Sequence, residues 1–325
     1  MDEIFHIPQA QKYCAYNFSS WDPMITTLPG LYLAAVSLLQ PLASLQGIGL
    51  LEICTTFNLR VVNIIFASGN FVLLFFLSSK LNGSKKELRK EQSYNILHAL
   101  VLVLFPVLYF FTWMFYTDHG SAFFTLLMYF CSLSGKHRVA SIAGIAAILF
   151  RQTNVIWVVF CLGLNKAQVL EEQLALDKKV RGNINNMKDT EVIKIMFKTT
   201  FSSVSRTLSI VTAILKRTFW YLCVILGFVV FVFLNKGIVV GDRGLLWRIC
   251  YVVCVFASLV PHSLLEFRYF IIPFYVLRLN MKPPCTKLLV VELLMYVVIN
   301  AATIFMFVKR PFYWPEVNTA QRFMW

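Results

Sequence analysis

Long apolar runs, separated by short polar or basic segments, dominate the sequence. The first strong run covers residues 58–79 and the second covers 93–115. A helix needs about 20 apolar residues to cross a typical bilayer core, so both runs are predicted membrane spans. Further apolar runs follow at 121–134, 139–165, 218–236, 245–265 and 287–308. The pattern therefore predicts an all-α membrane protein that crosses the bilayer many times.

The N-terminal part differs because its apolar residues are mixed with polar ones. Residues 4–16 and 24–45 have this mixed character, and we expect short helices that are broken by prolines and lie at the membrane surface. The stretch 28–45 could also be buried. The prolines concerned are Pro8, Pro23, Pro29 and Pro41. Cys14 and Cys54 could form a disulfide if this part faces an oxidising compartment, which the sequence leaves open.

The basic segments predict the topology. Residues 80–90, 136–138 and 166–217 carry more than half of the 30 Lys and Arg residues. The positive-inside rule places all three in the cytosol. If 139–165 were one span, 166–217 would emerge on the other side. We therefore predict two short helices that meet at Arg151–Asn154, an arrangement tolerated where the break is buried in protein or lines a cavity.

Composition agrees with a membrane protein, since 58% of residues are hydrophobic and 14% are charged. Soluble domains are about 45–50% apolar and about 25% charged. The net charge of +14 lies in loops between apolar runs, which disfavours nucleic-acid binding. The chain contains no CxxC pair, Gly-rich phosphate loop, GxSxG or HExxH motif. We expect an N-terminal lumenal segment at 1–57, membrane bundles at 58–165 and 218–325, and a basic cytosolic loop at 166–217.

Polar residues with catalytic potential gather on the side opposite the basic loops in this topology. They are Asp2, Glu3, His6, Trp21, Asp22, Asp118, His119, Arg151, Gln152, Asn154, Asp242 and Arg243. Glu266 and Arg268 lie within apolar sequence, where ionisable residues are functional candidates. A carboxylate can act as general base on a sugar hydroxyl, and an arginine can bind a lipid phosphate. One inverting displacement needs a single base, which fits sugar transfer from a lipid phosphate, whereas a glycosidase typically needs two carboxyl groups.

Structural roles are open for several of these residues. Asp118 and His119 could cap a helix, and Asp242 with Arg243 could form an interfacial ion pair. Arg151 could extend its charge to the membrane surface, and Trp21 could be an interfacial anchor.

Six strings carry a resemblance to a known family. They are DEIFHIPQAQKYC, WDPMITTLPGLYL, LFRQTNVIWVVF, NKGIVVGDR, LLEFRYFIIP and QRFMW. The chain resembles the dolichyl-phosphate-glucose α-1,2-glucosyltransferases, which add the terminal glucose to the lipid-linked N-glycan precursor in the endoplasmic reticulum. The similarity runs through most of the chain in the same order.

The resemblance implies a GT-C-like helical bundle of roughly 8–10 spans, with short lumenal helices and an active site that faces the lumen. The donor would be dolichyl-phosphate glucose and the acceptor a diglucosylated dolichol-linked oligosaccharide. Transfer would invert the donor anomer and need no cofactor or metal. The pair Asp2 and Glu3 matches the family's base, with Asp2 slightly preferred. The charge and predicted depth of Arg151 and Arg268 make them candidates for binding the donor phosphate. Other expected partners are membrane lipids.

The chain departs from the family pattern at two points. Relatives carry a transmembrane helix before the acidic pair, so we expect the chain to begin at an internal methionine. Relatives also carry further spans and a histidine motif after Arg243, and loss of an odd number of spans leaves the side of Arg268 and of the C-terminus open. The alternative function is therefore a non-catalytic membrane regulatory or interaction protein, or an inactive truncated form. A transporter is disfavoured because no internal repeat is visible.

Overall fold

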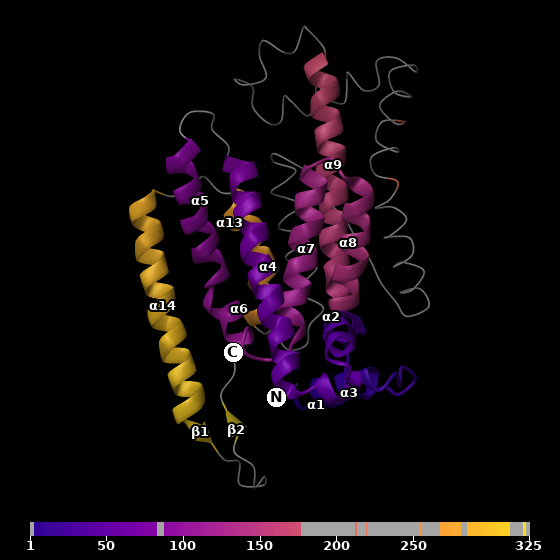
Figure 1. Ribbon diagram of the computed structural model, residues 1–325. Coiled ribbons are helices and arrows are strands. Elements are labelled where there is room, and N and C mark those ends of the chain that lie inside the picture. Colours follow the sequence, from indigo (N-terminus) through magenta and orange to yellow (C-terminus); the bar gives the residue numbers. More distant parts are fainter. Residues whose placement is uncertain are drawn as a thin grey trace. The chain divides into compact units, whose positions relative to one another are not determined.

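The computed structural model describes residues 3–82, 88–176, 212, 219, 254, 267–280, 285–312 and 321–322. The secondary structure of the described residues is helical apart from one antiparallel pair of short strands, β1 and β2 (Figure 1). The helices are α1 (Glu3–Cys14), α2 (Gly30–Gln46), α3 (Leu50–Ile53), α4 (Thr56–Asn82), α5 (Leu88–Val103), α6 (Pro106–Phe111), α7 (Thr117–Leu133), α8 (His137–Phe150), α9 (Val155–Leu176), α13 (Ile271–Asn280) and α14 (Thr286–Lys309), with 3-10 turns η1 (Gln152–Asn154) and η3 (Phe267–Phe270); the strands are β1 (Pro311–Phe312) and β2 (Gln321–Arg322).

The described residues fall into two compact units. Unit 1 takes those within 1–130, 146–152 and 264–325, and unit 2 takes those within 131–145 and 153–263. Unit 1 contains α1 to α6 and most of the residues that the sequence analysis singled out.

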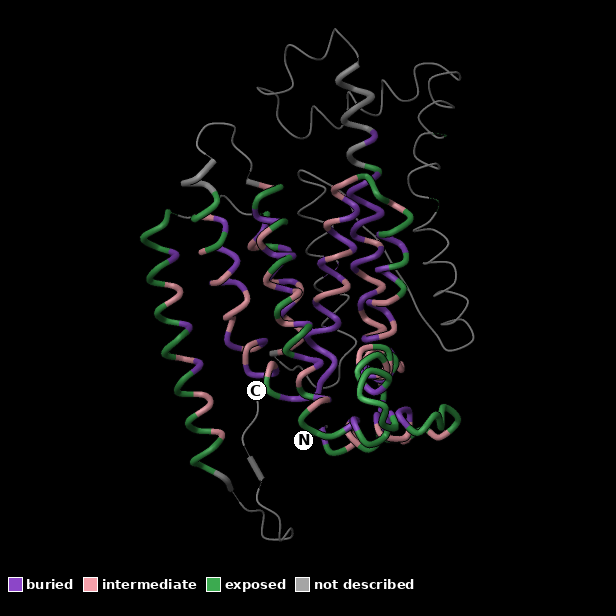
Figure 2. The backbone as a smooth tube through the Cα atoms, in the orientation of Figure 1, coloured by how far each residue is buried: buried purple, intermediate pink, exposed green. Residues whose placement is uncertain are grey.

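Two of the described helices, α4 and α14, are long and apolar enough to cross a membrane. Their positions agree with the helices predicted at 58–79 and 287–308. In unit 1, α5 folds back along α4, and Ser78 Oγ lies 3.0 Å from Nδ1 of His98. Much of α14 is exposed along its length, as a lipid-facing helix would be (Figure 2). The expected total of spans stays a prediction, and the runs at 218–236 and 245–265 lie almost wholly outside the described residues.

Three expectations about helix breaks were wrong. Pro8 and Pro41 lie inside continuous helices, α1 and α2, because packing between the two helices offsets the single backbone hydrogen bond that each proline removes. The run 93–115 is not one helix. It stops at Val103 and restarts at Pro106, whose ring disfavours helical geometry in the residue before it.

The predicted break at Arg151–Asn154 is confirmed. Helix α8 ends just before it, a 3-10 turn follows, and α9 begins directly afterwards. Within unit 2, Asn165 of α9 donates to the hydroxyl of Ser132 at 3.0 Å, so α9 returns to the end of the unit where α8 begins. The hinge 136–138 and the start of the basic segment at 166 therefore lie at one end of unit 2, as the charge distribution predicted.

Candidate active site

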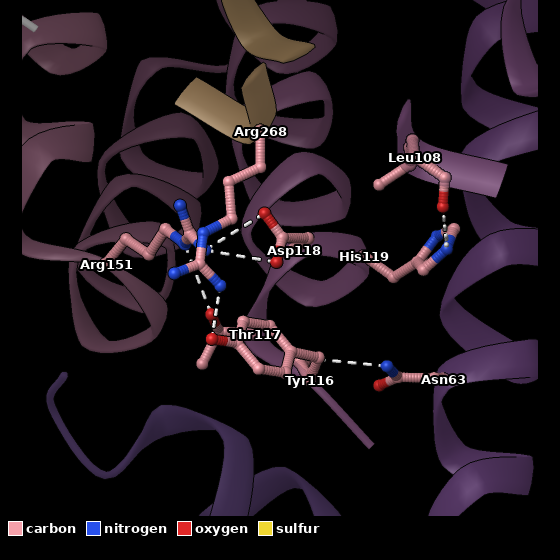
Figure 3. A network of polar contacts seen from close by, with 8 residues as sticks. All are labelled: Asn63, Leu108, Tyr116, Thr117, Asp118, His119, Arg151 and Arg268. Carbon is pink, nitrogen blue, oxygen red and sulfur yellow. Dashed lines mark hydrogen bonds and ion pairs between the residues drawn. The ribbon is translucent and has the colours of Figure 1, made fainter. Parts of the chain in front are cut away.

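The centre of the candidate site is an ion pair between the end of α8 and the start of α7. Arg151 donates from Nε to Thr117 Oγ1 at 3.1 Å, and its Nη2 lies 3.0 Å from each oxygen of Asp118 (Figure 3). The Asp118 side chain is only 3% exposed. Its position in the first turn of α7 also suits a carboxylate, since backbone N–H groups point toward it there.

A second arginine joins this pair from η3. The guanidinium of Arg268 donates to the hydroxyl of Tyr116 and lies 4.9 Å from the centre of its ring. Both arginines also lie within 6 Å of the Tyr269 ring, at 5.7 Å for Arg151 and 5.9 Å for Arg268. Figure 3 shows the two arginine side chains converging from different elements on the region of Asp118 and Tyr116. Asp118 pairs with Arg151, and the guanidinium of Arg268 lies near the same Tyr269 ring. Two neighbouring guanidinium groups suit an anionic ligand.

This contact answers a question that the sequence left open. If an odd number of spans is missing before Arg268, counting spans does not decide on which side of the membrane Arg268 lies. The structure places it beside Tyr116, at the same end of unit 1 as Arg151.

Close packing holds Arg151 in place. The preceding residue, Phe150, packs against the rings of Phe66 and Phe124, with ring centres 5.5 and 5.4 Å apart. Its ring also fills the space above Gly120, where an added Cβ would lie 2.0 Å from Phe150 Cε1. Gly120 thus lets α8 end close against α7, which brings Arg151 within reach of Asp118.

Of the two acids at the N-terminus, the structure describes only Glu3. Asp2 lies outside the described residues. Glu3 is buried, and Arg60 of α4 donates a hydrogen bond to each of its two carboxylate oxygens at 2.8 Å. The backbone N–H of Phe115 adds a third bond, to Oε1, at 2.9 Å.

His6 connects α1 to the arginine network. Its Nδ1 lies 2.5 Å from the hydroxyl of Tyr32, and its ring meets the Tyr116 ring edge-on at 5.1 Å. Tyr13, on the same helix, also packs against Tyr32, and burial raises the pKa of its phenol. His6 therefore supports the tyrosine that receives the Arg268 hydrogen bond.

Trp21 and Asp22 stand at the more exposed edge of this region. The Trp21 indole donates to the carbonyl of Ile25 at 3.2 Å, and the residue is 38% exposed. Asp22 accepts from the Met24 backbone at 2.9 Å, while its own N–H donates to Gln9 Oε1 at 3.0 Å. Both residues thus shape the loop that follows α1.

His119 does not join the arginine network although it follows Asp118 in sequence. It is fully buried, and its Nε2 lies 3.1 Å from the carbonyl of Leu108 and 2.9 Å from Thr112 Oγ1. Asn70 donates to its backbone carbonyl at 3.1 Å. These contacts tie α7 to α4 and α6.

The remaining predicted site residues make other contacts or lie outside the described part of the chain. Gln152 donates to the carbonyl of Thr26 at 2.8 Å, and Asn154 is buried in unit 2. Asp242, Arg243 and Glu266 lie outside the described residues. Among the described residues, no group of three His, Cys, Asp or Glu side chains could hold a metal ion.

The sequence analysis missed three residues that structure this site: Arg60, Tyr116 and Tyr269. Arg60 offered a signal, since it is a charge placed just inside an apolar run. The two tyrosines offered none, because only the fold brings their rings against arginines.

A disulfide joins Cys14 and Cys54, with Cα atoms 6.4 Å apart. It ties the end of α1 to the residue that follows α3. The pairing that the sequence left open is thus present, and such bonds persist in oxidising compartments.

Comparison with known proteins identifies relatives of the chain. Its sequence matches the DIE2/ALG10 family over residues 1–245 and 243–279. It is 33% identical to a rat protein named Dol-P-Glc:Glc(2)Man(9)GlcNAc(2)-PP-Dol alpha-1,2-glucosyltransferase, with 100% of this chain and 93% of the relative covered. A human protein of that name is 30% identical with the same coverage, and one from Arabidopsis thaliana is 41% identical over 50% of this chain and 33% of its own length. No solved structure matches.

The alignment with the rat relative is longer than the chain itself. It runs over 448 positions, whereas the chain has 325 residues. Within the aligned region, part of the relative's sequence therefore has no counterpart in this chain. The two segments that match the family meet at residues 243–245, where the sequence analysis placed a missing stretch.

Proposed function

Because the chain belongs to the DIE2/ALG10 family, we propose that it transfers glucose from dolichyl-phosphate glucose to a diglucosylated dolichol-linked oligosaccharide. The observation that carries this proposal is similarity along the whole chain to relatives named for that reaction. The chain is a polytopic membrane protein, and its place would be the endoplasmic reticulum. The Cys14–Cys54 disulfide favours a lumenal position for the N-terminal segment.

The proposed reaction is a single inverting displacement. The acceptor 2-hydroxyl loses its proton to a carboxylate and its oxygen bonds to C1 of the glucose. The bond between C1 and the phosphate oxygen breaks, and dolichyl phosphate leaves with the electron pair. A base is needed on one side of the sugar and positive charge on the other.

The described residues supply the positive charge. Arg151 and Arg268 converge near the Tyr269 ring, and Asp118 pairs with Arg151. A phosphate between the guanidinium groups would receive paired N–H donors, the geometry in which arginine binds phosphate most strongly. Asp2 is the proposed base, in the position that the family pattern assigns to it.

The other candidates take supporting roles in the proposal. Asp118 orients Arg151, and His6 supports Tyr116. Trp21, Asp22 and Gln152 lie nearer the surface, where an oligosaccharide could reach them. Asn154, Asp242, Arg243 and Glu266 remain candidates for donor or acceptor contacts.

The test is transfer in microsomes from cells that lack their own enzyme of this type. The full chain is supplied with labelled dolichyl-phosphate glucose and the diglucosylated acceptor, and the product is digested with a linkage-specific glucosidase. We expect an α-1,2-linked glucose. Asp2→Asn should abolish transfer, while the exposed Glu52→Gln should leave it unchanged.

The second candidate function is a non-catalytic membrane protein built on the same scaffold. It is favoured by the difference between 448 aligned positions and 325 residues. A chain that forms its disulfide and inserts normally, yet transfers no glucose, would support this alternative.

A further inference from the structure

We infer that Glu3 is a positioning residue, not the base, and that it acts with Arg60 and the Phe115 backbone as a clamp. The clamp fixes the end of α1 that carries Asp2 relative to the arginines proposed to bind the donor phosphate. This inference rests on the proposed function and separates the roles of two neighbouring acids.

The hydrogen bonds of Glu3 argue against a base. Oε1 accepts from Arg60 Nε at 2.8 Å and from the Phe115 N–H at 2.9 Å, while Oε2 accepts from Arg60 Nη2 at 2.8 Å. The Glu3 side chain is only 7% exposed. Taking a proton from a sugar hydroxyl would require this carboxylate to give up charge-assisted bonds to a bidentate partner. Its geometry therefore suits a fixed anion.

The position of each of the three groups in the clamp favours the contact that it makes. Phe115 lies between α6 and α7, so its N–H has no helical partner and needs an acceptor. Arg60 lies near the start of α4, where Glu3 satisfies part of its charge. Glu3 occupies the first turn of α1, a position that favours an acid.

The residues beside the clamp belong to the proposed chemistry. Glu3 is bonded in sequence to Asp2, and Phe115 is bonded to Tyr116, whose hydroxyl receives the hydrogen bond from Arg268. A change in the clamp would therefore shift the base relative to the phosphate site. A misplacement of about 1 Å can lower a rate about 10²-fold.

The first experiment compares kinetics of Glu3→Gln with those of the unaltered chain. We expect kcat to fall about 10²-fold while KM for the acceptor changes little. The acid limb of the pH–rate profile should stay in place, because it reports the ionisation of Asp2. Loss of that limb in Glu3→Gln, or full activity of Asp2→Asn, would overturn the inference. Glu52→Gln, an exposed acid of α3, is the matched control.

A double-mutant cycle tests whether the pair acts as a unit. Arg60→Gln should lower kcat about as much as Glu3→Gln, and the variant with both changes should be no slower than either. If the fold-reduction in kcat of the combined variant equalled the product of the two single reductions, the residues would act independently, which would contradict the clamp. Arg60→Lys keeps the charge but cannot bind both oxygens, so we expect an intermediate rate.

Amide hydrogen exchange separates this inference from the proposed function. In Glu3→Gln, exchange should become faster in residues 3–14 and 112–116, while the Cys14–Cys54 disulfide still forms. Unchanged exchange would overturn the clamp whether or not the chain transfers glucose. An unaltered chain without transfer would overturn the proposed function, and the exchange result would still decide the clamp.

Discussion

At the residue scale, the site depends on contacts between residues far apart in sequence. Arg151 reaches back to the start of α7, and Glu3 reaches forward to α4 and Phe115. Charge and apolar context singled out Arg151 and Arg268 from the sequence, and the family resemblance singled out Glu3. Pattern alone could not pair Glu3 with Arg60, because no local spacing relates two residues on different helices.

Arg151→Lys should weaken donor binding. A lysine carries the charge but cannot span Thr117 and Asp118 as the guanidinium does. Hydrogen bonds to charged groups contribute about 1.5–3 kcal/mol each, which corresponds to roughly a 10- to 150-fold rise in KM for dolichyl-phosphate glucose. Initial-rate kinetics measure it, with Arg138→Lys on the exposed hinge as control. An unchanged donor KM would remove Arg151 from the phosphate proposal.

Gly120→Ala should destabilise the protein by about 1–3 kcal/mol, since overpacking forces neighbouring groups to move. The new Cβ would lie 2.0 Å from the Phe150 ring, which other aromatic rings hold in place. A lower thermal unfolding midpoint in detergent is the expected result. Gly49→Ala is the control, because its Cβ meets only the flexible end of Glu52, at 3.3 Å. Equal midpoints for the two variants would contradict the packing argument.

At the element scale, the predictable features were those with a local cause. The break at 151–154 could be predicted because polar residues interrupt an apolar run and basic loops lie on either side. The effect of each proline on its helix could not be predicted, because it depends on the position of the proline in the helix and on packing against other helices. Pro106 begins α6 shortly after α5 has ended, whereas Pro8 and Pro41 lie inside helices that tertiary contacts stabilise.

The N-terminal helices should lose stability without their disulfide. Cys14 and Cys54 are separated by 40 residues, and removal of a native disulfide typically costs about 2–5 kcal/mol. Cys14→Ser, Cys54→Ser and the variant with both changes should therefore show the same lowered unfolding midpoint. Cys285→Ser, which changes an exposed free cysteine, should leave it unaltered. A midpoint that falls further in the combined variant would mean that the two thiols act separately.

At the scale of the whole molecule, charge distribution predicts sidedness and the fold gives it geometric support. In unit 1 the loop between α4 and α5 is basic, while α1, Arg151 and Arg268 lie toward the opposite end of α4. The sequence could not decide the side of Arg268, because the parity of the spans before it was open. A tertiary contact with Tyr116 supplied what counting spans could not.

This sidedness predicts where the chain can carry an N-glycan. Asn17 and Asn82 both begin Asn-X-Ser sequons, but only Asn17 belongs to the segment with the disulfide. Asn17 is exposed in the loop after α1, where its Oδ1 accepts from Ser19 Oγ at 3.1 Å. Asn82 ends α4 beside the basic loop, so the positive-inside rule predicts that it lies in the cytosol. Endoglycosidase treatment of the microsomal protein should increase its gel mobility. Asn17→Gln should abolish that shift, and Asn82→Gln should not. A glycan on Asn82 would place the basic loop in the lumen. Arg151 and Arg268, at the opposite end of α4, would then face the cytosol and could not act on a lumenal acceptor.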